Sequence, residues 1–166
     1  DLHSFPTRRS SDLHIALIAL HSLVRWLLLA ALILAIYRSY RGWLGRRGFQ
    51  QWDNRLRVWT VTLAHVQLVI GVWLYLVSPL ISNFYDNYSV EVSNRQTRFF
   101  GMEHSLMMAL AVTFITIGAS KARRRQLAAP KFKAMAIWFT IALVIIFVSI
   151  PWPFSPMAAR PWFRPF

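Results

Sequence analysis

The sequence predicts an all-α membrane protein, a bundle of four transmembrane helices. Composition is the first observation: of 166 residues, 56% are hydrophobic and only 15% are charged, whereas soluble domains carry about a quarter charged residues. The second is a positive mean hydropathy of +0.40. The third is spacing, because four apolar segments of about 20 residues, the length that crosses the hydrocarbon core of a bilayer, are separated by polar segments.

Residues 1–13, DLHSFPTRRSSDL, are predicted to be a non-native segment. They match, in frame, the translation of the end of a common short-read sequencing adapter. We therefore expect the native start to be missing, and we leave Arg8, Arg9 and His3 out of the arguments about topology and ligands.

The predicted spans follow in order within one domain, residues 14–154. They cover residues 14–37, 56–80, 99–120 and 134–154. Prolines end two of them, because proline lacks the N–H that continues a helix: Pro79 closes the second span and Pro151 the fourth. The first segment is too polar, and is followed by too many further spans, to be a cleaved signal peptide. Residues 155–166 form a C-terminal tail with no assigned role.

Basic residues in the connecting segments predict the orientation in the membrane. Twelve Lys and Arg lie in segments 38–57 and 121–133, against four in segments 81–98 and 155–166. Connections rich in Lys and Arg stay in the cytoplasm. Both basic loops are therefore predicted to be cytoplasmic and both termini outside, in a bacterial inner membrane.

The composition also limits the partners and cofactors. The formal net charge of +13 does not indicate a nucleic-acid partner, because the basic residues are confined to short segments between apolar runs. The expected partner is the lipid bilayer. The chain has no cysteine, which excludes disulfides, iron–sulfur clusters, thiolate-bound zinc and covalently attached c-type haem.

Two histidines on different spans are predicted to lie at the same depth. The first and third spans both run inward, and a helix advances about 1.5 Å per residue. His104 comes five residues after Phe99, where the third span begins, which places it about 7–8 Å below the outer boundary. His21 comes seven residues after His14, about 10 Å below that boundary.

Imidazoles from two helices that face each other across an iron are a common way for a helix bundle to hold haem b. His21 and His104 are therefore the predicted pair of axial ligands to haem iron. His65 lies on the second span, about 13 Å from its inner end, and is the substitute ligand. It would need about 5–10 Å of axial adjustment by tilt or register.

Two charged residues complete the predicted site. Arg25 lies one helical turn from His21 on the same face, and an arginine inside the membrane requires a partner. That partner is Glu103, a haem propionate or a quinone carbonyl. Glu103 is the only acidic residue within the predicted spans; it is expected either to pair with Arg25, which we favour, or to carry a proton.

Other roles for these polar groups stay open. A histidine in a membrane span is often an interhelical hydrogen-bond partner rather than a ligand, and Gln67 is expected to act in this way. His65, Glu103 and His104 could instead form a proton relay in a haem-free carrier or conduit. The polar groups could also only lock helix packing in an accessory subunit of a larger membrane complex.

The chain resembles a family of small bacterial four-span membrane proteins labelled "cytochrome b". The matching stretches, which extend over nearly all of residues 15–154, are ALIALHSLVRWLLL, YRSYRGWLG, DNRLRVWTVTLAHVQLVIGVWLYLVSPL, RFFGMEHSLMM and IPWPF. It is more faintly similar to the membrane-bound protoporphyrinogen oxidases, in the His-then-Trp order of the first span and in GVWLYL. The lysine that those enzymes carry in a later span has no equivalent in residues 99–120.

The resemblance implies a membrane protein that binds haem b. Together with the paired histidines, it predicts electron transfer within the membrane, to or from a quinone or as a subunit of a respiratory complex. An electron-transfer protein or oxidoreductase subunit is expected rather than a stand-alone enzyme, with a protoporphyrinogen-oxidase-like activity as the lesser alternative. The sequence leaves a homodimer open.

Overall fold

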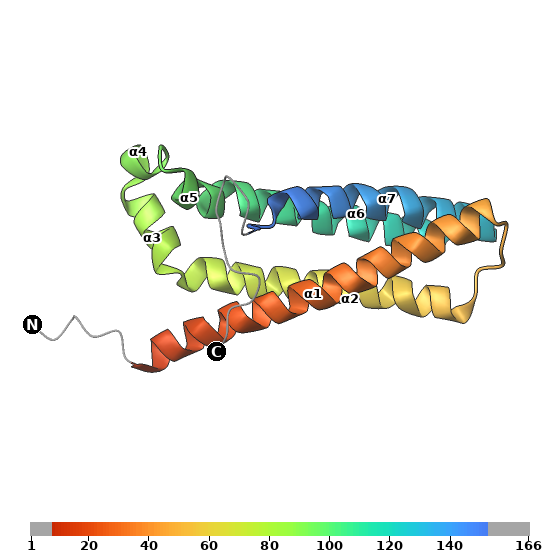
Figure 1. The fold of residues 1–166 in the computed structure, drawn as a ribbon, viewed down its shortest axis with the longest axis horizontal. Helices are drawn as coiled ribbons and strands as arrows, with labels where there is room; N and C mark the ends of the chain where they lie inside the picture. Colours follow the sequence, from red (N-terminus) through yellow and green to blue (C-terminus); the bar gives the residue numbers. More distant parts are fainter. Residues whose placement is uncertain (1–7, 153–166) are drawn as a thin grey trace, which may run out of the picture.

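The computed structural model describes residues 8–152, and its regular structure there is entirely helical (Figure 1). Four helical stretches are long and apolar enough to cross a membrane: Asp12–Leu44, Gln51–Val77, Arg95–Arg124 and Ala128–Ser149. These stretches confirm the predicted all-α fold with four spans. The protein is therefore a multi-pass helical membrane protein.

The first helix, α1 (Arg8–Leu44), includes the end of the segment predicted to be non-native. Residues 1–7 of that segment and the predicted tail 155–166 lie outside the described residues. The next helix, α2 (Gln51–Val77), begins five residues before the predicted span. Its start is fixed by a capping box in which the Asp53 carboxylate accepts the backbone N–H of Gln50 at 2.9 Å.

Short helices occupy the connection between the second and third spans. They are α3 (Pro79–Asp86), α4 (Tyr88–Glu91) and α5 (Arg95–Arg98). Proline opens α3 because its missing N–H needs no partner in the first turn of a helix. We call this end of the bundle the cap end, and the short helices are at the left in Figure 1.

The third span is not one regular α-helix. A π-helical turn, η1 (Phe99–Glu103), joins α5 to α6 (His104–Arg124). The last helix, α7 (Ala128–Ser149), begins six residues before the predicted span, with Pro130 in its first turn. The connections α1–α2 and α6–α7 lie together at the opposite end, which we call the basic end (Figure 1).

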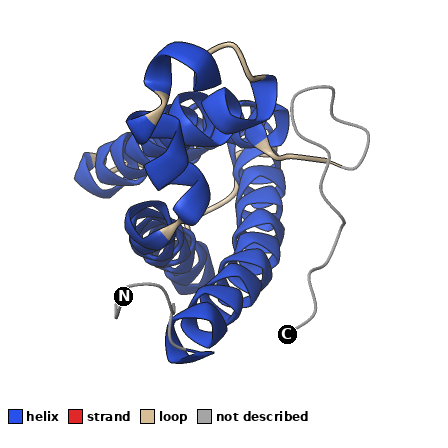
Figure 2. Cartoon of the chain, turned by 90° about the vertical axis from the view of Figure 1, so that its left-hand side faces the viewer, coloured by secondary structure: helices blue, strands red, loops and turns tan. Residues whose placement is uncertain are grey.

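The four long helices pack around a common core. α1 packs against α2 and α7, and α6 packs against the same two helices, so α1 and α6 lie diagonally across the bundle. Figure 2 looks along the bundle from the cap end, with the short helices in front. Leu32 of α1, Ile115 of α6 and Phe139 of α7 are fully buried in the core between these helices.

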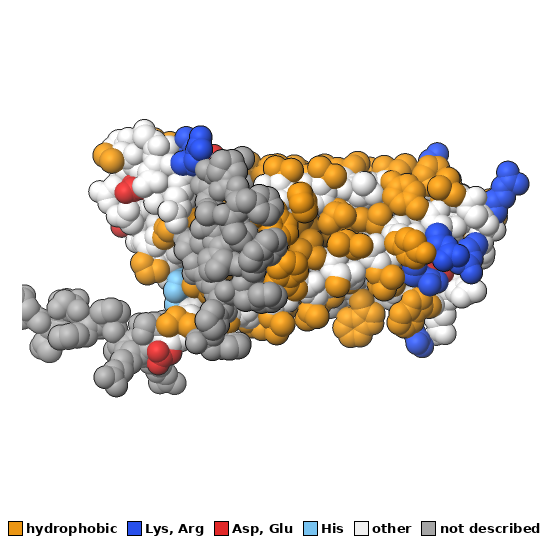
Figure 3. All heavy atoms as spheres, in the orientation of Figure 1, with side chains coloured by type: hydrophobic (Ala, Val, Ile, Leu, Met, Phe, Trp, Pro, Cys, Tyr) orange, Lys and Arg blue, Asp and Glu red, His pale blue; other side chains and the backbone are white. Residues whose placement is uncertain are grey.

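The surface divides into an apolar belt and a basic end. Large apolar side chains are exposed along the length of every long helix, among them Leu27, Val69, Leu106 and Val144. On the face shown in Figure 3, apolar side chains cover much of the middle of the molecule, and most of the visible Lys and Arg lie at the basic end. This is the surface expected of a protein whose helices are surrounded by lipid.

A close contact between α6 and α7 depends on Gly118. A Cβ atom at this position would lie 2.6 Å from the Cβ of Trp138 and 3.3 Å from the Phe139 ring. We expect Gly118→Val to lower the stability by about 2 kcal/mol or more, because the Trp138 Cβ is fixed to the backbone and cannot move aside. The measurement is the Tm in detergent, followed by tryptophan fluorescence.

The matched control is Gly48→Val. No atom lies within 4 Å of a Cβ built at Gly48, so this variant should keep a near-parental Tm. Equal Tm values for the two variants would contradict the close packing of α6 on α7.

Candidate functional site

The structure brings His21 and His104 together in the cap half of the bundle. His21 belongs to α1, and His104 is the first residue of α6. Although these two helices are diagonal, the two imidazoles lie within electrostatic range of each other. Both side chains are half-buried. Residues that are 83 positions apart in the sequence therefore lie in the same half of the bundle.

His104 is held in a definite tautomer. Its Nδ1 lies 3.0 Å from the backbone carbonyl oxygen of Ser149, the last residue of α7. A carbonyl oxygen only accepts, so Nδ1 carries the proton and donates it. In a neutral imidazole this leaves the lone pair on Nε2, the atom that binds iron when Nδ1 is held by a carbonyl.

The π-helical turn positions this imidazole. The backbone N–H of His104 donates to the carbonyl of Phe99, five residues earlier, where a regular α-helix would use the residue four earlier. The rings of Phe99 and Phe100 lie 5.7 and 6.1 Å from the His104 ring, measured between centroids. His104 thus lies against two aromatic rings from η1. Single π-helical turns of this kind occur frequently at functional sites.

Tertiary contacts stabilise the π-helical turn. The Tyr75 hydroxyl donates to the carbonyl of Gly101 at 2.6 Å, and it lies 2.7 Å from the hydroxyl of Tyr85. A Cβ at Gly101 would lie 2.6 Å from the Phe84 ring, so glycine is required for this approach. The irregular backbone before His104 is therefore held by side chains from α2 and α3.

His21 is positioned by α2. Gln67 donates from Nε2 to the backbone carbonyl of His21 at 3.0 Å, which is the interhelical role expected of this glutamine. Gly71, which has no side chain, lies beside the imidazole, since a Cβ there would be 3.3 Å from Cε1 of His21. Among the described residues, neither Nδ1 of His21 nor Oε1 of Gln67, both buried, has a hydrogen-bond partner.

Arg25 is the cation of the site. Its Nη2 donates to the Ser22 hydroxyl at 3.3 Å, and its guanidinium lies 5.3 Å from the centre of the Trp26 ring. The guanidinium is also within electrostatic range of both His21 and His104. A positive charge therefore lies beside the two imidazoles, as required for binding an anionic group there.

The pairing of Glu103 with Arg25 that the sequence suggested is wrong. Glu103 instead accepts from Nε of Arg98 at 2.9 Å, and both side chains are about two-fifths exposed. The π-helical turn explains the difference, because its five-residue hydrogen bonds bring residues 98 and 103 over each other. The carboxylate is consequently held by Arg98, the last residue of α5 at the cap end.

His65 does not join the other two histidines. It is exposed, its Nδ1 donates to the backbone carbonyl of Val61 at 2.8 Å, and its Nε2 lies 3.4 Å from the hydroxyl oxygen of Thr116. These contacts place His65 on the exposed side of the bundle where α2 meets α6, partway along the two helices. The substitute ligand of the sequence prediction thus lies away from the pair.

Sequence reasoning missed several residues of this site. The Ser149 carbonyl could not be predicted, because any residue at the end of α7 offers one. Tyr75 and Gly101 were also missed, since their contact depends on the packing of α2 against η1. A glycine three residues before an intramembrane histidine was the only local signal for the irregular turn.

The fold and the site define a class: a four-span helical membrane protein with two half-buried histidines and an arginine near one end of the bundle. Within residues 8–152, no group of three or more His, Cys, Asp or Glu side chains could hold a metal ion. Haem iron needs only two axial ligands from the protein. Comparison with family models, with curated proteins and with solved structures gives no match.

Proposed function

We propose that this protein is a haem b protein that transfers electrons within a membrane, with His21 and His104 as the axial ligands. The single observation that carries the proposal is that these two imidazoles, from diagonal helices, lie within electrostatic range of each other, with the lone pair of His104 left on Nε2. A ligand on each of two diagonal helices suits a planar group that lies in the core between them.

The donor set fits haem b. Nδ1 of His104 is occupied by the Ser149 carbonyl, which orients the ring and strengthens it as a ligand. Arg25, close to both histidines, has the charge to bind a propionate. When bound, haem b supplies one-electron chemistry at its iron. The rings of Phe99 and Phe100 would pack beside the His104 ligand.

The proposed electron partner is a quinone dissolved in the bilayer. A groove of about 610 Å³ runs between α1 and α7 on the side of the bundle next to this site. The described residues that line it are apolar, and Trp26, the neighbour of Arg25, is one of them. A lipid-soluble carrier would therefore approach the haem from the membrane without crossing polar surface. Association with a larger respiratory complex is part of the same proposal.

The orientation is also proposed, from charge alone. Twelve basic residues lie in the two connections of the basic end, and four lie in the other segments between and after the spans. This excess favours a cytoplasmic basic end. The cap end, and with it the pair of histidines, would then lie toward the outer face of a bacterial inner membrane.

The haem-free alternatives receive less support. A proton relay through His65, Glu103 and His104 would need contacts between these groups, yet among the described residues no hydrogen bond joins any two of them. A purely structural role for the histidines would be expected to leave each imidazole with two satisfied nitrogens. His21 instead keeps a buried Nδ1 without a hydrogen-bond partner in the described part of the chain.

The proposed function is tested by the absorption spectrum of the detergent-purified protein, expressed with haem supply. We expect a sharp b-type α band in the dithionite-reduced minus air-oxidised difference spectrum. A short-chain quinol added without oxygen should also reduce the iron. A correctly folded protein that stays colourless after haem reconstitution would contradict the proposal.

A further inference from the structure

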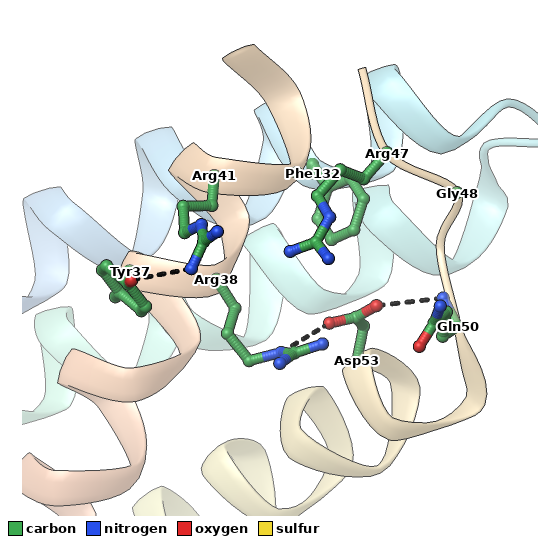
Figure 4. A pocket seen from close by; sticks show the side chains of 9 residues that line it. Tyr37, Arg38, Arg41, Arg47, Gly48, Gln50, Asp53 and Phe132 are labelled. Carbon is green, nitrogen blue, oxygen red and sulfur yellow. Dashed lines mark hydrogen bonds and ion pairs between the residues drawn. The ribbon is translucent and has the colours of Figure 1, made fainter. Parts of the chain in front are cut away.

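A polar cavity at the basic end is unrelated to the histidine site. It has a volume of about 170 Å³ and lies between the end of α1, the α1–α2 connection and the start of α7. Its main lining residues are Tyr37, Arg38, Arg41, Arg47, Asp53 and Phe132. In Figure 4 the Arg38 guanidinium reaches the Asp53 carboxylate, the Arg47 guanidinium lies above that carboxylate, and the Arg41 guanidinium turns toward Tyr37.

The lining carries more positive than negative charge. Asp53 is its only carboxylate, and both oxygens are engaged: Oδ1 accepts from Nε of Arg38 at 2.8 Å, and Oδ2 accepts from the backbone N–H of Gln50 at 2.9 Å. Arg41 donates to the neutral Tyr37 hydroxyl at 3.0 Å. Among residues 8–152, no carboxylate forms an ion pair with Arg41 or Arg47.

Two uncompensated guanidinium groups beside one cavity favour an anion with several oxygens. Arginine offers a planar fork of N–H donors that matches phosphate oxygens two at a time. The cavity is several times the volume of one water, about 30 Å³, which leaves room for a phosphoryl group and part of its ester substituent. Asp53 holds Arg38 in place and so shapes one wall of the cavity without cancelling the other two charges.

The place of the cavity indicates where the phosphoryl group comes from. It lies at the end of α1, beside the α1–α2 connection, where a transmembrane helix leaves the apolar belt, which is the level of lipid headgroups. Tyr37, beside the cavity, is 55% exposed, and Leu44, at the end of the same helix, is 73% exposed. Apolar and aromatic surface next to a basic cavity would accommodate the upper part of an acyl chain.

We propose that this cavity binds the phosphoryl headgroup of an anionic phospholipid, held mainly by Arg41 and Arg47. Basic pockets between transmembrane helices bind such headgroups by charge and by hydrogen bonding together. Free phosphate carries the same chemistry and is the alternative source. The site does not depend on the presence of haem.

The test measures lipid binding by the purified full chain in detergent with native mass spectrometry and with Tm shifts. The probes are a phosphatidylglycerol, a phosphatidylcholine with the same acyl chains, and inorganic phosphate. The test variant is Arg41→Gln/Arg47→Gln. The control variant, Arg46→Gln/Arg55→Gln, removes the same charge from the same end, and neither of its residues lines the cavity.

We expect phosphatidylglycerol to bind the parental protein and the control variant and to raise their Tm, with phosphatidylcholine and phosphate having little effect. The test variant should bind phosphatidylglycerol at least about tenfold more weakly, because two charge-assisted contacts are lost. Equal weakening in both variants would overturn the proposal, since only net charge would then matter. A phosphate effect equal to that of phosphatidylglycerol would overturn the assignment to lipid.

A single variant keeps the test decisive if the double variant does not fold. Arg47 lies in the connection and makes no side-chain hydrogen bond or ion pair with the described residues, so Arg47→Gln should fold normally. It should show a measurable part of the loss of phosphatidylglycerol binding. Unchanged binding in this variant, with Arg46→Gln as its control, would contradict the proposal.

Discussion

His104→Ala and His21→Ala are each expected to remove haem b from the purified protein, whereas His65→Ala is expected to retain it. Removing either axial ligand leaves the iron with one protein ligand and an open cavity. Even the loss of a group that only orients a metal ligand lowers the metal affinity about 10- to 100-fold, so the loss of the ligand itself should have a large effect. His65 lies apart, hydrogen-bonded within α2 and near Thr116 of α6. The measurement is the haem content per protein, from the reduced-minus-oxidised α band.

His65→Ala is the matched control, because it removes the same side chain from another membrane helix. Circular dichroism and size-exclusion chromatography should show that all three variants fold. A second variant, His104→Gly, separates ligation from packing, because added imidazole should restore the α band by filling the vacated position. Haem that survives in His104→Ala, or is lost only in His65→Ala, would contradict the proposed ligand pair.

Asp53→Asn is expected to destabilise the basic end by about 1–3 kcal/mol. The Asp53 side chain is 4% exposed and serves two donors, the Arg38 Nε and the backbone N–H of Gln50. Asparagine has a single acceptor oxygen, so one donor loses its partner and the Arg38 charge loses its counter-ion. Since the Arg38 side chain is 32% exposed, water compensates part of the loss.

The Tm in detergent, followed by tryptophan fluorescence, should fall on the order of 5 °C for Asp53→Asn. Asp86→Asn is the control, because Asp86 is exposed on α3 and, among the described residues, its side chain accepts only from the Ser82 hydroxyl, at 3.2 Å. This control should change the stability by less than about 0.5 kcal/mol. The same Tm for both variants would show that the buried pair does not stabilise the connection between α1 and α2.

Hydropathy predicted the four spans well because each helix must cover the apolar core of the membrane. The helix ends were predicted less well. α2 and α7 begin five and six residues before their predicted spans, at Gln51 and Ala128. These first turns are held by local hydrogen bonds outside the apolar region, such as the Gln50–Asp53 capping box, so hydropathy does not report them. The short helices α3 to α5 were not predicted either, because hydropathy does not report helices that are held by local hydrogen bonds.

The sequence proposed the histidines of the candidate site but did not predict most of their contacts. Depth along the spans selected His21 and His104, and the structure places the two imidazoles within electrostatic range of each other; their role as ligands stays a prediction. Glu103 was assigned the wrong partner because a regular α-helix was assumed across residues 99–103. The π-helical turn there depends on Tyr75 and Phe84 from other helices, and a local sequence pattern carries no such information.

The diagonal placement of α1 and α6 was also beyond the sequence. Four spans can close into a bundle in more than one order, and hydropathy does not distinguish these orders. The order seen here depends on close approaches such as Gly118 on Trp138 and Gly71 on His21. Small residues in spans indicate that helices approach closely, but they do not indicate which helices.

The most direct test of the haem assignment is low-temperature electron paramagnetic resonance of the air-oxidised, haem-supplied protein. Two imidazole ligands impose a strong ligand field, so we predict a low-spin ferric signal that becomes high-spin or disappears in His21→Ala and in His104→Ala. A folded protein with no ferric haem signal would contradict the account. So would a low-spin signal that persists in both variants.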